Sequence, residues 1–323
     1  MNKEVSLTLE RERADLKSAA DRTRLRSFIS PLEPGPGDQE KAAKSQPVPV
    51  HHDMSVAEAF ETVVQSCIQH FRSNEPLVSR RRDPAALHQV RVAMRRLRAA
   101  FSLFRPALAD PQFEGLRQEV RWFTRQLGEA RNLDVLLQER GLARPLRKSL
   151  KKERDEAYDQ VVDALSSKRL RLLQIDLLSW IELGRWHHSR KAMRPLPDFT
   201  ARRLYKWWRM IEHHHDLHSM RTQERHQLRI EIKKLRYALE FVQPLHVQAG
   251  GKHKHFYRAV ERIQESLGRL NDLANSQTIA RKLGHKPPRS KGEVREIEGK
   301  CLAAAQTSLD RLKKIGPYWT KLS

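Results

Sequence analysis

The chain has 323 residues, of which 39% are hydrophobic and 31% charged, so it is long enough to bury a sizeable core. Its 62 Lys and Arg residues outnumber its 39 Asp and Glu residues and give a net charge of +23, which predicts a polyanionic partner. The charged opening segment and the lack of long apolar runs argue against secretion and membrane insertion, and the two cysteines, Cys67 and Cys301, predict no disulfide framework. We therefore expect a soluble, cytoplasmic protein.

Residues 1–50 differ from the rest of the chain. They hold nine cationic and eight acidic residues, so they contribute only +1 to the net charge. The first 28 residues show little apolar periodicity beyond one possible charged helix, and residues 31–50 contain five prolines and two glycines. We assign 1–50 to a flexible N-terminal extension and Pro-rich linker that does not build the binding site.

From Met54 onward the sequence shows helical periodicity and no convincing alternation of strand residues, which predicts an all-α fold. Asp83-Pro84 and Asp110-Pro111 have the N-cap and proline pattern of helix starts. The expected helices are 54–72, 84–105, 111–139 with a break near Gly128, 145–183, 198–216, 222–248, 255–283 with a break near Gly268, and 291–315.

One basic helix occurs twice. The segment HQVRVAMRRLRAAFSLFRP, from His88, returns at His226 as HQLRIEIKKLRYALEFVQP, 138 positions later. A second pair follows, because RQLGEARNLDVL around Gly128 corresponds to ESLGRLNDLANS around Gly268 at an offset of 140. The duplication predicts two similar helical bundles, 51–192 and 193–323, that meet near residues 185–197.

Both copies of the basic helix carry a cationic stripe beside an apolar face, at about 100° per residue. Like charges on successive turns repel, and few carboxylates on the first helix compensate them. Guanidinium and ammonium groups bind phosphate oxygens, and a ladder of them suits a linear polyanion better than a compact one. The predicted polyanion-binding residues are His88, Arg91, Arg95, Arg98, His226, Arg229, Lys233 and Arg236, with Arg96, Lys234 and Arg131 as secondary candidates.

Other interpretations of these residues are open. A charged stripe on a single helix is usually a solvated face, although its duplication favours a ligand-binding role. His214 and His218 have a spacing that can hold a transition metal, but surface histidines explain it more simply, and we expect neither a metal nor a cofactor. The usual phosphate-loop, zinc-protease and serine-hydrolase motifs are missing, so the sequence favours binding without catalysis.

The paired HxxRxxxRRLR and HxxRxxxKKLR helices, each followed by a Leu-Gly motif, closely resemble the CHAD (conserved histidine α-helical domain) family over roughly residues 51–320. The resemblance implies two four-helix bundles related by a pseudo-twofold axis. It also implies a basic central channel that binds inorganic polyphosphate and is lined by the eight predicted polyanion-binding residues. Association with polyphosphate granules is a further implication.

The chain departs from the family pattern in two places. The 50 residues before the helical part are too short for the triphosphatase-like tunnel domain of some members and lack its ExExK pattern. The first Leu-Gly motif continues with Arg131-Asn132 where members often have Arg-Asp, whereas the second copy keeps Asp272. A nonspecific nucleic-acid binder and a metal-dependent phosphohydrolase are the alternative functions.

Overall fold

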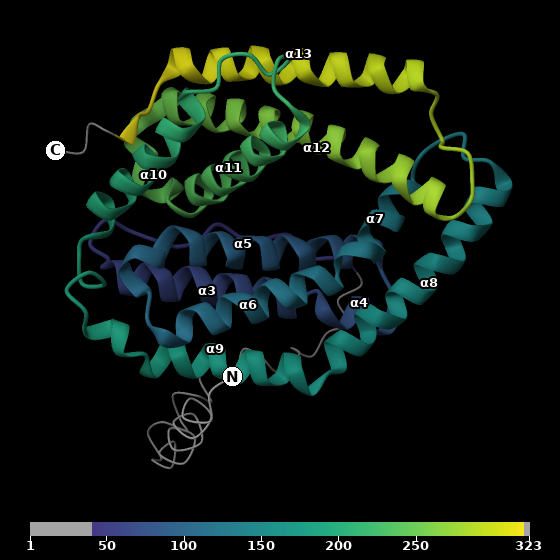
Figure 1. Ribbon diagram of the computed structural model, residues 1–323. Helices are drawn as coiled ribbons and strands as arrows, with labels where there is room; N and C mark the ends of the chain where they lie inside the picture. The colour runs from purple at the N-terminus through teal and green to yellow at the C-terminus, as the bar shows by residue number, and fades with distance from the viewer. Residues whose placement is uncertain (1–40, 320–323) are drawn as a thin grey trace.

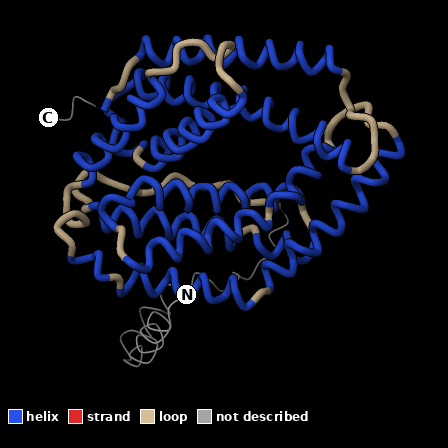
Figure 2. The backbone as a smooth tube through the Cα atoms, viewed as in Figure 1, coloured by secondary structure: helices blue, strands red, loops and turns tan. Residues whose placement is uncertain are grey.

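The computed structural model describes residues 41–319, and this part of the chain is all-α, as predicted (Figures 1 and 2). Its only β pairing is an isolated bridge between Ser55 and Pro195. None of its helices is both long and apolar enough to cross a membrane. The α-helices are α3 (Val56–Arg72), α4 (Glu75–Arg81), α5 (Pro84–Leu108), α6 (Pro111–Gln126), α7 (Gly128–Leu137), α8 (Arg144–Ser166), α9 (Lys168–Leu183), α10 (Leu196–Glu212), α11 (Thr222–Phe241), α12 (Gly250–Lys282) and α13 (Lys291–Ile315), with 3-10 turns η2 (Arg185–His188) and η3 (Gln243–Ala249).

Side-chain caps fix several helix starts. The carboxylate of Asp83 accepts the backbone N–H of Ala86 at 2.7 Å, and that of Asp110 accepts the N–H of Phe113 at 2.8 Å. Each cap is followed by a proline, which has no N–H to leave unpaired in the first turn. The two helix starts predicted from Asp-Pro pairs are therefore confirmed.

The predicted helix boundaries are wrong in several places. The expected helix 222–248 ends at Phe241 and is followed by the 3-10 turn η3. The expected helix 145–183 is two helices, because Ser167 adopts an extended backbone and caps α9 through Leu170 N–H at 3.1 Å. The predicted break at Gly268 is missing, since a glycine inside a long packed helix costs only about 1 kcal/mol. The short helix α4 was not predicted.

Figure 1 shows α3, α5, α6 and α9 on one side of the molecule and α10 to α13 on the other, with α8 running along the edge between α7 and α9. One continuous cluster of buried apolar side chains includes residues from both sides, so the core crosses the predicted boundary at residues 192/193. Backbone hydrogen bonds from Val56 to Arg194 and from Leu196 to Met54 tie the start of α3 to the start of α10. The division into two pseudo-symmetric bundles stays a prediction.

Residues 41–50 correct the predicted extent of the flexible linker. Val48 and Val50 are buried, and the side-chain oxygen of Asn74 accepts the N–H of Ala43 at 3.0 Å. The apolar side chains and backbone groups of this segment therefore pack on the helical core despite its prolines. The predicted charged helix in the first 28 residues lies outside the described part.

Candidate anion-binding site

The two basic helices, α5 and α11, contact each other. On each helix the apolar face enters the core, with Val90 and Leu97 of α5 and Ile232 and Leu235 of α11 all buried. Since the cationic stripe lies beside this face, packing of the two helices brings the stripes close together.

A group of mutually interacting charges, here called the central cluster, forms where these stripes meet. Burial, followed by the charges of Arg95 and Arg131, lowers the pKa of Arg91 to about 10, and Asp272 acts in the opposite direction. Arg95 also acts on Arg229. The central cluster comprises His88, Arg91 and Arg95 of α5, Arg131 of α7, Arg229 and Lys233 of α11, and Asp272 of α12.

Lys233 is the most perturbed cation of the central cluster. Burial lowers its pKa to about 7, and the positive charges of Arg229, Arg95 and Arg91 act in the same direction. Asp272 is the carboxylate that favours its charged form, but this effect is outweighed. The ammonium group is therefore held where an added anion would stabilise it.

His88 sits at the start of the first stripe and is half-buried. Burial, followed by the charges of Arg131 and Arg95, lowers its pKa to about 4, so it is neutral near pH 7. Its counterpart His226 is exposed. The two histidines, equivalent in the sequence, thus occupy different environments.

Several buried nitrogen atoms of the central cluster lack partners. Nε and Nη1 of Arg91, Nε of Arg229 and Nδ1 of His88 are buried and have no hydrogen-bond partner within residues 41–319. A buried polar atom that makes no hydrogen bond is costly, so such atoms in a folded protein usually contact a bound water, an ion or a ligand.

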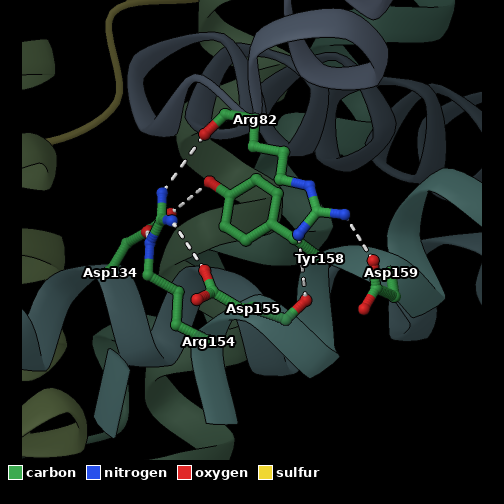
Figure 3. Close-up of polar contacts among 6 residues, drawn as sticks. All are labelled: Arg82, Asp134, Arg154, Asp155, Tyr158 and Asp159. Carbon is green, nitrogen blue, oxygen red and sulfur yellow. Dashed lines mark hydrogen bonds and ion pairs between the residues drawn. The ribbon is translucent and has the colours of Figure 1, made fainter. Parts of the chain in front are cut away.

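Arg131 joins the central cluster because α7 is held firmly in place. Buried Asp134, one turn along α7, accepts a hydrogen bond from Arg154 Nε at 2.7 Å and one from the Tyr158 hydroxyl at 2.8 Å (Figure 3). Arg154 Nη2 also donates to the backbone oxygen of Arg82 at 3.2 Å, which links α8 to the turn before α5. Burial, with the charge of Arg95, lowers the pKa of Arg131 and outweighs Asp134, which favours its charged form. Arg131 forms no ion pair with a carboxylate within residues 41–319, so its guanidinium can bind an added anion.

Arg98 marks a strongly positive end of the stripe on α5. It is exposed, and its pKa is lowered by desolvation and then by Arg121, Arg117 and Arg125 of α6. These three α6 arginines recur every four residues, a spacing that could have revealed them in the sequence. Only Arg117 is paired, with Glu114 at 2.6 Å; Arg121 and Arg125 have no carboxylate partner within the described residues.

Arg236, the counterpart of Arg98, has the opposite surroundings. Its guanidinium lies 4.0 Å from both Glu240 and Glu261, and Nη1 donates to the Tyr257 hydroxyl at 3.2 Å. Burial disfavours its charged form, but Tyr237, Tyr257 and Glu240 outweigh burial and raise its pKa. The two stripes, predicted as equivalent, therefore end differently.

Arg96, a secondary candidate, is not placed to bind a ligand. Its side chain is 0% exposed and forms an ion pair with Glu240 at 2.8 Å, and its guanidinium lies over the ring of Phe241. It therefore joins α5 to α11 inside the core. Lys234, its counterpart, is half-buried and lies about 100° around the helix from Lys233, on a different face.

The histidine-rich segments lie elsewhere. His214 faces Glu231 at 3.7 Å, while the backbone N–H of His218 is engaged by Asp216. No group of three or more His, Cys, Asp or Glu side chains is placed to hold a metal ion in the described part of the chain.

The CHAD domain family model matches residues 62–281, which is more than half of the chain and includes both basic helices. The chain belongs to the CHAD domain family. Its fold is similar to the crystal structure of the CHAD domain from the plant Ricinus communis, with a TM-score of 0.68 and 26% identity over 88% of this chain and 98% of the plant domain. PptA from Streptomyces chartreusis is a more distant likeness, with a TM-score of 0.49 and 16% identity over 81% of this chain and 99% of that protein. No curated protein matches the chain significantly.

Proposed function

We propose that this CHAD protein binds inorganic polyphosphate at the central cluster and does so without catalysis. The family is linked in general to polyphosphate binding, and CHAD domains are in general binding domains. Association with polyphosphate granules follows as part of the proposal, because a granule presents many such chains at one surface.

The buried, unpartnered nitrogen atoms of Arg91, Arg229 and His88 are the observation that carries the proposal. Five cations of the central cluster are opposed by two carboxylates, Asp272 and Asp134, and Asp134 is also paired with Arg154. Phosphate oxygens would supply the missing acceptors and offset the mutual repulsion of these cations. The cluster draws on α5, α7 and α11, which suits a ligand that touches several helices.

The main alternative partner is nucleic acid, which any protein this basic attracts nonspecifically. Binding of single strands usually uses aromatic side chains that stack on bases. Trp207 and Trp208, which the sequence analysis assigns to packing, are indeed buried, and Tyr237 beside the cluster is buried as well. The cluster therefore offers charge without a stacking platform, which favours a phosphate chain that has no bases.

The test compares binding of long-chain polyphosphate and of single- and double-stranded DNA at physiological salt. The first variant, R91A/R95A/R229A/K233A, removes four cations of the central cluster, and a control variant, R144A/K148A/K151A/K168A, removes four exposed cations from α8 and the start of α9. We expect wild type to prefer polyphosphate, and the cluster variant alone to lose about three units of the slope of log K against log salt. Equal slopes in the two variants, or a preference for DNA, would overturn the proposal.

A further inference from the structure

A surface hollow of about 850 Å³ is lined by the end of α5, the turn η2 and the residues after it, and the middle of α10. Trp186 and Trp207, both buried, contribute to its base, and Asp110 is the one carboxylate that lines it. Six cationic side chains line it as well: Arg105, Arg185, Arg190, Lys191, Arg203 and Lys206.

The carboxylates close to these cations are already engaged. One oxygen of Asp110 caps α6, and the other accepts the indole N–H of Trp180 at 2.8 Å. Glu114, which acts on Arg105, is held by Arg117 through two hydrogen bonds. Arg105, Arg185, Arg190, Lys191 and Lys206 are all exposed and form no ion pair within residues 41–319. The hollow therefore keeps its positive charge.

Structural contacts fix the base of the hollow before any ligand arrives. Pro106 has no N–H, so the carbonyl of Ser102 loses its helical partner, and Arg203 of α10 replaces it by donating Nη2 to this oxygen at 2.9 Å. Arg203 Nε also donates to the carbonyl of Leu103 at 3.1 Å. These bonds join α10 to the end of α5. Arg203 is therefore a structural residue, unlike the exposed cations at the rim of the hollow.

Trp186 is held just as firmly. Its indole N–H donates to the carbonyl of Trp180 at 3.1 Å, and its ring packs so closely on Gly184 that a Cβ there would lie 2.2 Å from the indole nitrogen. A preformed base reduces the entropy that binding would otherwise cost.

Cationic side chains follow α5 from the central cluster toward this hollow. Arg95 acts on Arg98, and Arg105 follows Arg98 by two helical turns on nearly the same face of α5, about 10 Å further along the axis. The α6 arginines flank Arg98 along the way. At the other stripe, Arg236 lies 4.0 Å from Glu261 and from Glu240, which it shares with Arg96, so no comparable extension starts there.

We propose that the hollow is a second phosphate-binding site, which takes the part of a polyphosphate chain that extends past Arg98. This inference rests on the function proposed for the central cluster. The wide opening and the separate, exposed cations suit successive phosphates of a flexible chain, with Lys191 and Lys206 as point charges and the arginines as forked donors.

The experiment uses the full chain and the variant R105A/R190A/K191A/K206A, which leaves the structural residue Arg203 in place. The control variant from the DNA comparison removes the same charge from exposed sites of α8 and the start of α9. Triphosphate and long-chain polyphosphate are titrated into each protein over a range of salt concentrations, and circular dichroism checks that the helices are intact.

For long-chain polyphosphate, we expect the hollow variant to bind at least about tenfold more weakly than the control variant, with a salt slope smaller by two to three units. For triphosphate, which is too short to reach beyond the central cluster, the two variants should agree within about twofold. Equal long-chain affinities would overturn the second site.

Two other outcomes separate this inference from the proposed function. If wild type itself shows no preference for polyphosphate, the central cluster is wrongly assigned and the extension fails with it. If the hollow variant loses triphosphate binding while R91A/R95A/R229A/K233A keeps it, the hollow is an independent small-anion site, which overturns the idea of one continuous chain.

Discussion

Lys233 should make polyphosphate binding depend on pH above neutrality. Its pKa of about 7 is set first by burial and then by Arg229, Arg95 and Arg91, against the opposing charge of Asp272. A phosphate beside the ammonium group would favour its charged form and return the pKa toward the ordinary value of about 10.5. By linkage, a ligand that raises this pKa must bind more tightly when the group is protonated.

The size of the effect follows from these two pKa values. Well below pH 7 the free protein already carries the proton, so affinity is at its maximum and flat, and it has fallen about twofold at pH 7. As the pH rises, the free protein loses the proton and the complex keeps it, so affinity should fall about fivefold between pH 7 and 8 and about tenfold over the next unit. His88, with a pKa of about 4, and Arg91, with a pKa of about 10, titrate outside this window.

Isothermal titration calorimetry in buffers of different ionisation enthalpy would measure the coupled proton directly. At about pH 8 we expect uptake of close to one proton per bound chain. The Lys233→Arg variant keeps a charge at every pH used, so it should bind without this uptake and with a flat pH profile. Because titration of the polyphosphate ends is common to both proteins, an equal pH dependence in wild type and variant would refute the role of Lys233.

Three further predictions concern the ends of the stripes, the buried ion pair and the N-terminal segment. Arg98→Ala should weaken long-chain polyphosphate binding about tenfold and Arg236→Ala less than threefold, because only Arg236 is neutralised by nearby carboxylates; equal losses in a competition assay would contradict this asymmetry. Arg96→Met leaves Glu240 with only its 4.0 Å contact to Arg236 and should lower the free energy of unfolding in urea by about 3 kcal/mol, whereas Lys234→Met, the matched change in the other copy, should cost less than 1 kcal/mol. A chain that starts at residue 51 should unfold at a lower temperature than one that starts at residue 41, because it loses the burial of Val48 and Val50, worth about 3 kcal/mol; equal melting temperatures would show that this packing contributes nothing.

The sequence predicts the fold well because helical periodicity, caps and the internal repeat all act locally. Asp83 and Asp110 start helices as expected, since a short side chain before proline needs no distant partner. The prediction for residues 41–50 is wrong because their packing depends on residues that are distant in the sequence. Their prolines suggest a flexible linker, but Val48 and Val50 are buried by helices far away in the sequence.

The candidate site could be predicted only in part, because a helical wheel assigns a residue to a face and says nothing about what that face meets. Arg91, Arg95, Arg229 and Lys233 converge in the structure. Arg96 directly follows Arg95 in the sequence, yet its side chain is fully buried and paired with Glu240. Whether Arg96 is buried or exposed depends on how α5 and α11 cross, and the sequence repeat alone does not specify that crossing.

The sequence repeat predicts two equivalent half-sites. In the structure the two halves differ in charge, because the helices beside the two cationic stripes have different side chains. At the offset of 140 that relates the Leu-Gly motifs, Arg117, Arg121 and Arg125 of α6 correspond to Tyr257, Glu261 and Glu265 of α12. The first set adds positive charge around Arg98, whereas Tyr257 accepts a hydrogen bond from Arg236 and the carboxylate of Glu261 lies 4.0 Å from it. Since electrostatic attraction sums over all nearby charges, a linear polyanion centred on Lys233 should extend toward Arg98 and not toward Arg236. On the proposed function, the direction of the bound chain would therefore be set by α6 and α12, which flank the two basic helices.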